Sequence, residues 1–518
     1  MCAMMYERTN EWIEHFIEQA GRKMSKQDLM LTAARAKWDT SSCSTVIVGK
    51  AVSATGHVIA AHNEDDTHGI TAVYQVPRKH HAPGDVAVFD DGKAEIPEIP
   101  ETYAYSWSEV RTEAGLAFGD NFINEKGVSV FSNSAHPCKD QKDESLGGDL
   151  GYGLRKIAAE RAGTAREGME IIASLVEQYG YYSSRNYCVC DKDEAWVIQI
   201  PRGHVVAARR VPDDEVYFIP NWFTIRQIDF SDEEHANWYW SPDLVPHAIE
   251  RGYYVPSKEN DYSDFDFAMV YQEEADRRDC WERADAAWQI LLGKKPAELR
   301  AFSYKPDRVL GLADCKKVLR DHFEGQPYGI TQGGKVSPHV DDHFCLCNSA
   351  TVESTVILFD EVPELTIVYR ALPRPCILPY VPWFLGITEF PEGYCWRSWE
   401  EAERTHFHTT SDDFRHDPRR AYSHFRALLY LTDADYEGNH ETAAVDAVTV
   451  EAAWQEQAAA LQASCREKLK DPGAMDAIRE ELTAFTRGKA AEALRWAQDE
   501  FYKIGEAELD RIMWRKDL

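Results

Sequence analysis

A cysteine opens the first of two apolar segments that can pair as a β-hairpin. Residues 43–50 read Cys-Ser-Thr-Val-Ile-Val-Gly-Lys, residues 53–56 supply a turn, and residues 58–65 end in His-Asn-Glu-Asp. β-Branched runs separated by a Ser/Gly turn are typical of paired antiparallel strands. The start of one strand lies beside the end of its partner in such a pair. We therefore expect the Cys43 thiol and the Asp65 carboxylate to share one site.

The thiol of Cys43 needs a base to act as a nucleophile, because a free thiol is largely protonated at neutral pH. Cleavage of the chain before Cys43 would expose an α-amino group, whose reference pKa of about 8 suits it to accept the thiol proton. The amine can then pass that proton to a leaving amine, so that one residue supplies nucleophile and general base. Cys2 is the rival, since removal of Met1 would expose it, but its flanking sequence is helix-like and lacks the strand and turn.

Residues 1–42 differ from the sequence that follows them. Apolar residues recur with helical spacing over residues 12–20, and a Ser-Lys-Gln-Asp sequence resembling a capping box precedes residues 29–38. Strand character begins at Cys43. We expect a helical leader over residues 1–42, either a propeptide removed at the bond before Cys43 or a permanent helical extension.

Blocks of strands and helices follow one another along the rest of the chain. The patterns predict strands and loops over 44–135, helices over 152–179, strands over 187–220, a short helix over 284–292, strands over 343–372 and helices over 445–515. This order favours an α+β arrangement of layers over a doubly wound βαβ sheet. We expect a main domain over residues 43–440 and a C-terminal helical region, residues 441–518, packed on it.

The composition excludes several classes of function. The chain of 518 residues has a formal net charge of −30, so nucleic acid and anionic membrane surfaces would be repelled. The sequence contains no run of about 18 uncharged apolar residues that would predict a membrane helix. The N-terminus also lacks the apolar segment of a secretory signal. We expect a cytoplasmic protein that binds neither nucleic acid nor membrane.

The 12 cysteines are too few for a disulfide scaffold in a chain of this length. Cys188 with Cys190 and Cys345 with Cys347 are spaced C-x-C on strand-like segments, which places both thiols of a pair on one face. A metal site is conceivable there, but histidines or cysteines at zinc spacing are missing nearby. Buried free thiols are the preferred interpretation. We expect no metal ion and no cofactor.

Segments beyond the hairpin occur in an order similar to that of the dipeptidase A family of cysteine N-terminal-nucleophile (Ntn) hydrolases. The hairpin resembles the mature N-terminus of that family. Further matches are Asp-Lys-Asp-Glu-Ala-Trp at 191–196, Ile-Pro-Asn at 219–221 and Leu-Pro-Tyr-Val-Pro-Trp-Phe at 378–384. The similarity covers about residues 43–395. It implies a four-layer αββα Ntn-hydrolase sandwich with added C-terminal helices, and a homo-oligomer.

The resemblance implies roles for three further residues around Cys43. Asp65 would orient the α-amine of the nucleophile, with a simple turn cap as the alternative. Asn221 would donate to an oxyanion or hold the substrate amide. Asn133 would complete the oxyanion hole, with a strand-end asparagine that satisfies a turn as the alternative.

Two basic residues complete the candidate site. His62 stands where relatives carry an arginine, so a side chain that titrates near neutrality replaces a permanent charge. Arg283 is a candidate for a second active-site arginine, with an arginine on a helix surface as the alternative.

The resemblance implies a cysteine Ntn hydrolase that cleaves amide bonds of short peptides, most simply a dipeptidase acting on a small peptide substrate. One alternative keeps the fold and takes an acyl amide, as penicillin V acylase and bile-salt hydrolase do. Another is a non-catalytic Ntn-like protein that serves as a binding or scaffold subunit. The long second half favours the dipeptidase, because those acylases are much shorter. The joint presence of Cys43, Asp65 and Asn221 argues against the scaffold.

Overall fold

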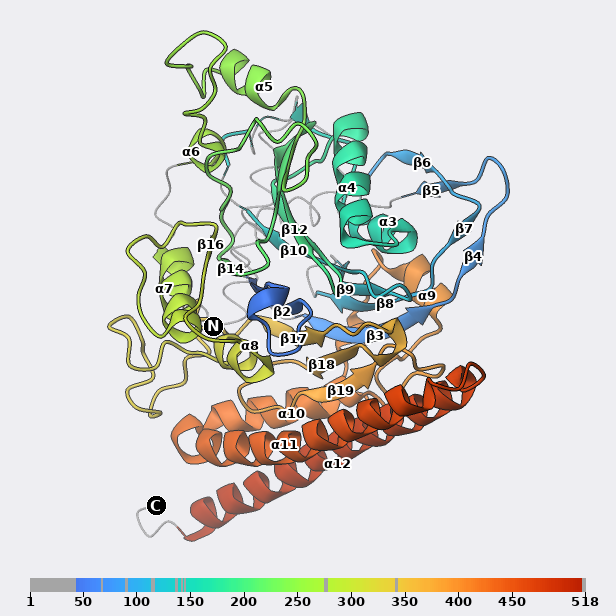
Figure 1. Ribbon diagram of the computed structural model, residues 1–518. Helices are drawn as coiled ribbons and strands as arrows, with labels where there is room; N and C mark the ends of the chain where they lie inside the picture. The colour runs from blue at the N-terminus through green and yellow to red at the C-terminus, as the bar shows by residue number, and fades with distance from the viewer. Residues whose placement is uncertain are drawn as a thin grey trace, which may run out of the picture.

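Two β-sheets lie face to face at the centre of the computed structural model (Figure 1). The structure describes residues 43–66, 69–88, 92–112, 117–135, 138–140, 143, 146–273, 278–340 and 343–514. The leader expected over residues 1–42 lies outside the described residues.

The first sheet contains the predicted hairpin. Its seven antiparallel strands run in the order β16-β14-β1-β2-β17-β18-β19. Their bounds are β1 (Ser44–Val48), β2 (Ile59–Asp65), β14 (Val216–Ile219), β16 (Ser303–Tyr304), β17 (Thr351–Leu358), β18 (Ile367–Ala371) and β19 (Val381–Phe384). β1 and β2 pair with Ser44 opposite Asn63 and Val48 opposite Ile59, which confirms the hairpin. Gly49 after β1 is required by space, since a Cβ there would lie 2.4 Å from the carbonyl oxygen of Pro212.

The second sheet has eight strands in the order β15-β13-β12-β11-β10-β9-β8-β3. Their bounds are β3 (Ile70–Val76), β8 (Tyr105–Arg111), β9 (Ala117–Asn124), β10 (Ser129–Ser134), β11 (Arg185–Cys190), β12 (Ala195–Arg202), β13 (Val205–Arg210) and β15 (Trp238–Trp240). Two short ribbons, β4 (Lys79–His80) with β7 (Glu101–Thr102) and β5 (Val86–Val88) with β6 (Glu95–Pro97), project from it.

Helices cover the outer face of each sheet. α3 (Leu154–Arg161) and α4 (Ala165–Tyr179) pack on the second sheet, and Thr164 Oγ1 caps the start of α4 by accepting from the Glu167 backbone N–H. The helices that contact the first sheet are α7 (Arg278–Leu292), α8 (Leu312–Leu319), α11 (Tyr436–Lys468) and α12 (Met475–Trp514). The remaining helices are α5 (Leu244–Glu250), α6 (Phe267–Tyr271), α9 (Trp399–Thr405), α10 (Ala421–Ala434) and the 3₁₀ turns η1 (Lys50–Val52), η3 (Pro363–Leu365) and η4 (Ser411–Phe414).

Three clusters of buried apolar side chains hold the four layers together. The period of two along β1 sends Val46 toward the helices over the first sheet and Ile47 toward the second sheet. A third cluster, which includes Ile172 of α4 and Val189 of β11, lies between the second sheet and its helices. Each buried side chain of this size stabilises the fold by about 1.5–3 kcal/mol. The predicted αββα arrangement is confirmed.

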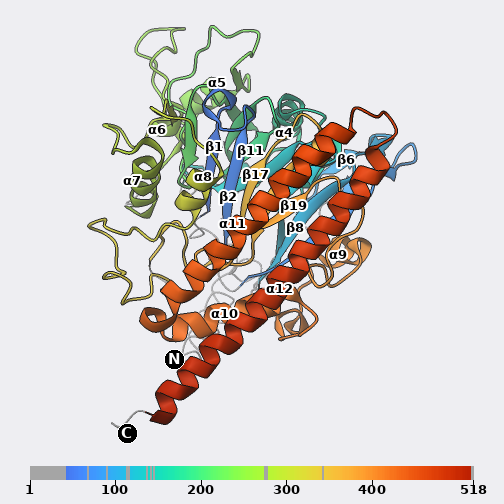
Figure 2. The ribbon, with the colours of Figure 1, turned by 60° about the horizontal axis from the view of Figure 1, so that its bottom comes forward.

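The C-terminal helices form part of the layer over the first sheet. Figure 2 shows α11 and α12 as a long helical hairpin crossing that sheet. Leu482 and Ala493 of α12 share a buried cluster with Val46 of β1. The domain boundary expected between residues 440 and 441 falls inside α11. None of the helices described is long and apolar enough to cross a membrane.

Candidate active site

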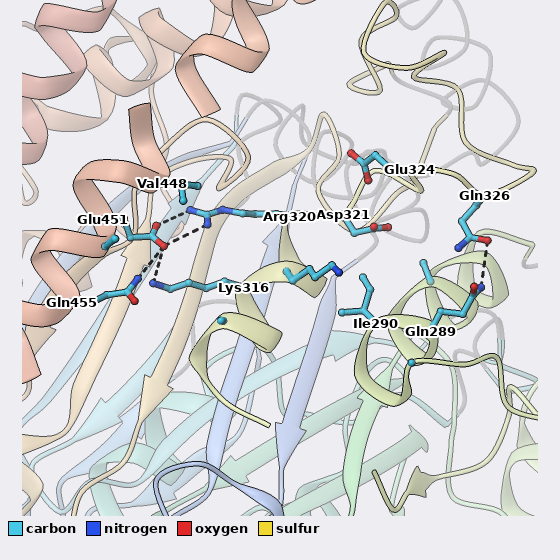
Figure 3. Close-up of a pocket in the computed structure, with 15 residues that line it drawn as sticks. Gln289, Ile290, Lys316, Arg320, Asp321, Glu324, Gln326, Val448, Glu451 and Gln455 are labelled. Atoms are coloured by element: carbon cyan, nitrogen blue, oxygen red, sulfur yellow. Dashed lines mark hydrogen bonds and ion pairs between the residues drawn. The ribbon is translucent and has the colours of Figure 1, made fainter. Parts of the chain in front are cut away.

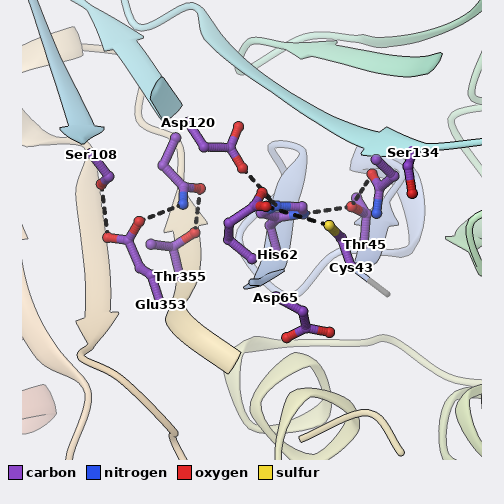
Figure 4. A network of polar contacts seen from close by, with 12 residues as sticks. Cys43, Thr45, His62, Asp65, Ser108, Asp120, Ser134, Glu353 and Thr355 are labelled. Atoms are coloured by element: carbon purple, nitrogen blue, oxygen red, sulfur yellow. Dashed lines mark hydrogen bonds and ion pairs between the residues drawn. The ribbon is translucent and has the colours of Figure 1, made fainter. Parts of the chain in front are cut away.

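Cys43 lies immediately before β1, with its side chain between the two sheets (Figure 4). It is 1% exposed, and its thiol donates to Glu64 Oε1 at 3.5 Å. Sequence analysis expected Asp65 at this place. The register of the hairpin, with Ser44 opposite Asn63, instead sets Glu64 across from Cys43. Glu64 is therefore the carboxyl group that contacts the candidate nucleophile Cys43, one residue earlier than expected.

His62 lies on the same face of β2 and connects the two sheets. Its Nε2 atom is 2.8 Å from Asp120 Oδ2 on β9 and 3.1 Å from Glu64 Oε2. Its Nδ1 atom is 2.7 Å from the Thr45 hydroxyl, which donates its own hydrogen to Asn133 Oδ1 at 2.8 Å. Since that hydroxyl can only accept from the ring, both ring nitrogens of His62 donate, as in an imidazolium.

His62 is protonated at neutral pH, so the expectation that it titrates near neutrality is wrong. Burial alone would lower the pKa of His62, but the charges and hydrogen bonds of Asp120 and Glu64 outweigh burial and raise it to about 10. Arg155 of α3 also donates to Asp120 at 3.0 Å, so this carboxylate is held ionised between two cations. A buried histidine thus carries a lasting positive charge at neutral pH.

The raised pKa of His62 makes stability depend on pH. The folded protein keeps this proton up to about pH 10, whereas an unfolded histidine loses it near pH 6.5. The folded state binds the extra proton, so its stabilisation is complete below about pH 6.5 and is lost as pH rises through about 10. We expect urea unfolding free energies to fall by a few kcal/mol across this window, at about 1.4 kcal/mol per pKa unit.

His62→Gln should flatten the slope of unfolding free energy against pH. His80→Gln, which changes an exposed histidine, should leave that slope unchanged. Equal slopes in all three proteins would contradict the assignment.

Asp65 points to the other face of β2, toward the helical layer. It accepts hydrogen bonds from Asn348 Nδ2 at 2.8 Å and Thr351 Oγ1 at 2.6 Å. Burial raises the pKa of Asp65 to about 7, although these bonds and the charge of Arg283 act to lower it. Its charge is still felt by the Cys43 thiol. Asp65 therefore lies near Cys43 with its carboxylate bound to Asn348 and Thr351.

The thiol of Cys43 is neutral in this setting. Burial, followed by the negative charges of Glu64 and Asp65, raises the pKa of Cys43 well above its usual value, while a backbone hydrogen bond involving Asp65 acts to lower it. Activation of the sulfur therefore requires a base. His62 cannot serve, because it already carries its proton.

Arg283 and Asn221 hold the backbone around the nucleophile. Arg283 on α7 is completely buried, so the alternative of a surface arginine is wrong. Its Nη1 atom donates to the Cys43 carbonyl oxygen at 2.7 Å and to Asn221 Oδ1 at 2.9 Å, and Nη2 donates to the Pro220 carbonyl at 3.3 Å. Asn221 has φ of 59°, a left-handed conformation that asparagine tolerates, and its Nδ2 donates to the Ser134 carbonyl at 3.0 Å.

We expect Arg283→Ala to lower kcat/KM by about 10²-fold or more, because a small displacement of a nucleophile has an effect of this size. Arg308→Ala, which removes an exposed arginine paired with Asp314, should have no effect. Steady-state kinetics together with thermal unfolding would separate misplacement from loss of fold. Full activity in a folded Arg283→Ala protein would remove Arg283 from the site.

Asn133 on β10 offers an unused donor. Its Oδ1 accepts from Thr45, and within the described residues its buried Nδ2 has no hydrogen-bond partner. A buried amide that leaves a donor unsatisfied loses free energy unless a ligand or intermediate takes the bond. This favours the predicted oxyanion role over that of an asparagine satisfying a turn.

Three residues of the network were not predicted: Thr45, Glu64 and Asp120. Thr45 and Glu64 could have been found from the period of two, which places them on the same face as Cys43 and His62. Asp120 comes from the other sheet, and no spacing in the sequence links it to the hairpin.

A separate cavity lies between α7, α8 and α11 (Figure 3). Its volume is about 880 Å³. Glu451 of α11 pairs there with Lys316 at 3.1 Å and Arg320 at 2.6 Å, which ties α11 to α8. No cysteine, serine or threonine is among the residues that line it, so it supplies no thiol or hydroxyl nucleophile.

Two groups of side chains among the described residues are close enough to hold a metal ion, although the sequence predicted none. One is His62, Glu64 and Asp120, whose hydrogen bonds and charges already satisfy one another. The other lies outside the site of Cys43 and consists of His322, His339, Cys347 and Cys376.

The chain is similar to several known proteins. The model of peptidase family C69 matches residues 42–442. Probable dipeptidase A of Streptococcus pyogenes serotype M18 (strain MGAS8232) is 25% identical over 427 residues, covering 77% of this chain and 84% of that protein. A dipeptidase of Bifidobacterium longum (strain NCC 2705) is 24% identical over 338 residues, covering 55% and 60%. Penicillin V acylase from Agrobacterium tumefaciens, a solved structure, is 13% identical with a TM-score of 0.30, covering 66% of this chain and 86% of that chain.

Because the family model spans most of the sequence and begins beside Cys43, the chain belongs to peptidase family C69 and is a peptide-cleaving hydrolase.

Proposed function

We propose that the protein is a cysteine-type dipeptidase in which Cys43 is an N-terminal nucleophile. The observation that carries the proposal is the position of Cys43, with its thiol beside Glu64 and its carbonyl oxygen held by Arg283. The family match and the dipeptidase names of the relatives support the substrate class.

Cleavage before Cys43 would release an α-amine next to the thiol. In the proposed mechanism the amine takes the thiol proton, and the sulfur attacks the carbonyl carbon of the scissile peptide bond. The tetrahedral oxyanion would accept a hydrogen bond from Asn133 Nδ2. The amine then gives its proton to the departing amino group, and water hydrolyses the thioester.

The acidic surroundings of the thiol favour an unblocked peptide over an acyl amide. Glu64 is a buried carboxyl group in contact with the Cys43 thiol, and burial raises the pKa of Glu64. The α-ammonium group of a free dipeptide would add a second positive charge beside Glu64, which shares the charge of His62 with Asp120. A neutral acyl chain would not.

Competition between substrates tests the proposal. We expect protein that begins at Cys43 to hydrolyse Ala-Ala with a kcat/KM about 10²-fold above that for N-acetyl-Ala-Ala, since loss of a buried charge pair costs about this much. Faster hydrolysis of penicillin V than of Ala-Ala would instead support the acylase. Hydrolysis of none of the three by folded, processed protein would support the scaffold.

Thiol reagents and chelators provide a further test of the proposed chemistry. We expect iodoacetamide to abolish hydrolysis in proportion to carboxamidomethylation of Cys43, measured by peptide mass spectrometry. A brief exposure to EDTA should leave the rate unchanged, because thiol attack and amine proton transfer require no Lewis acid. Immediate loss of activity in EDTA, restored by zinc or manganese, would contradict a thiol mechanism.

A further inference from the structure

Four potential metal ligands from separate segments meet beside the helical layer of the first sheet. His322 follows α8, Cys347 precedes β17, and Cys376 lies between β18 and β19, while His339 comes from the connection between α8 and β17. Both imidazole side chains are 2% exposed, Cys347 is 0% and Cys376 6% exposed. One ligand atom from each of the four lies within 4.8 Å of every other.

The distances between these ligand atoms fit the edges of a zinc tetrahedron. With Zn–N bonds of about 2.05 Å and Zn–S bonds of about 2.3 Å, tetrahedral angles give N···N edges of about 3.3 Å and N···S edges of about 3.6 Å. The two Nε2 atoms of His322 and His339 are 3.2 Å apart. The Cys376 sulfur is 3.7 Å from His339 Nε2.

Carboxylates orient both imidazoles toward the same point. His322 Nδ1 is 2.9 Å from Glu324 Oε1, and His339 Nδ1 is 3.0 Å from Asp433 Oδ1. A carboxylate accepts from Nδ1–H, which leaves the lone pair on Nε2. Two such lone pairs facing each other repel unless a metal ion or a shared proton lies between them. Carboxylates that fix the tautomer in this way are typical partners of metal-binding histidines.

We propose that His322, His339, Cys347 and Cys376 bind one zinc ion in a closed structural site. Two neutral imidazoles and two thiolates match the ligand types and charge that Zn²⁺ takes in tetrahedral N₂S₂ sites. Four protein ligands leave no open position for substrate or water, so the ion takes no part in peptide cleavage. The proposal is independent of the role of Cys43.

The ion would stabilise the segment that holds Asp65. Cys347 is followed by Asn348, whose Nδ2 donates to Asp65. The preceding carbonyl of Leu346 accepts from Asn63 Nδ2 at 2.7 Å. Zinc would thus fix residues 345–348 against the end of β2. Through Asp433 it would also anchor α10, on which that carboxylate lies.

Metal content decides the proposal. Protein purified without a metal-binding tag and dialysed against zinc-free buffer should contain about one zinc per chain by inductively coupled plasma mass spectrometry. Cys347→Ala and Cys376→Ala should reduce this at least about tenfold. Cys345→Ala, which removes an equally buried thiol two residues away, should retain the zinc.

Cobalt and mass measurements keep the test decisive if the ligand variants fail to fold. Wild-type protein expressed in cobalt should show the intense visible bands of tetrahedral Co²⁺ and a thiolate-to-cobalt charge-transfer band. Zinc below about 0.1 per chain with no such spectrum would overturn the proposal. So would full zinc content in folded Cys347→Ala and Cys376→Ala, or a Cys347–Cys376 disulfide found by mass spectrometry.

Discussion

Cys43→Ala is expected to abolish peptide hydrolysis and leader removal together, lowering kcat/KM by at least about 10⁴-fold, as loss of a covalent nucleophile does elsewhere. Both reactions depend on the same sulfur, which lies between the sheets beside Glu64. The fold should survive, because alanine removes one buried sulfur atom and leaves the Cys43 carbonyl, which Arg283 holds, in place. Dipeptide hydrolysis, intact mass and thermal unfolding of the purified variant are the measurements.

Two further variants sharpen the test. Cys43→Ser should keep a small part of both activities, because a hydroxyl is the weaker nucleophile at this pH. Cys188→Ala removes another fully buried thiol, on β11, and should keep both activities in full. Full hydrolysis by Cys43→Ala would rule out the nucleophile, whereas equal loss in Cys188→Ala would mean that removal of any buried thiol disturbs the protein.

Features encoded in short stretches of sequence were predicted correctly. The hairpin of β1 and β2 follows from two apolar runs and a turn, and the helical pattern over residues 152–179 corresponds to α3 and α4. Alternating blocks of strands and helices also identified the layers. These signals are local, so no knowledge of distant contacts is needed to interpret them.

Features that depend on contacts across the fold were missed. The charge of His62 is set by Asp120, which belongs to the other sheet, so the residue type alone gave the wrong pKa. The burial of Arg283 depends on how α7 packs against the ends of β1 and β14. The four ligands of the proposed zinc site are spread over residues 322–376. Sequence rules for zinc sites look for ligands at short, fixed spacings, so they could not have indicated this site.

Active enzyme is expected to begin at Cys43, after cleavage of the bond between Ser42 and Cys43. In the precursor, the nitrogen of Cys43 is an amide and has no basic lone pair, so it cannot take the thiol proton. The sulfur can still attack the Ser42 carbonyl carbon, which moves the acyl group from nitrogen to sulfur and frees the amine. Water then hydrolyses this thioester and releases a peptide of 42 residues.

Activity should therefore rise in step with release of the peptide, from a precursor at least about 10³-fold less active. Intact mass and N-terminal sequencing of samples taken during maturation would follow both, with Cys43→Ala as the precursor that never matures. A homogeneous, fully active chain that still begins at Met1 would place the base elsewhere.

His62 could not be that other base, because Asp120 and Glu64 keep it protonated up to about pH 10. Glu64 would then be the candidate, since it contacts the sulfur directly and its pKa is raised by burial and by the charge of Asp120. Glu64→Gln in that uncleaved chain should abolish hydrolysis. In an enzyme that uses the α-amine of Cys43, the same substitution should leave proton transfer intact and mainly weaken binding of the substrate's ammonium group, seen as a raised KM.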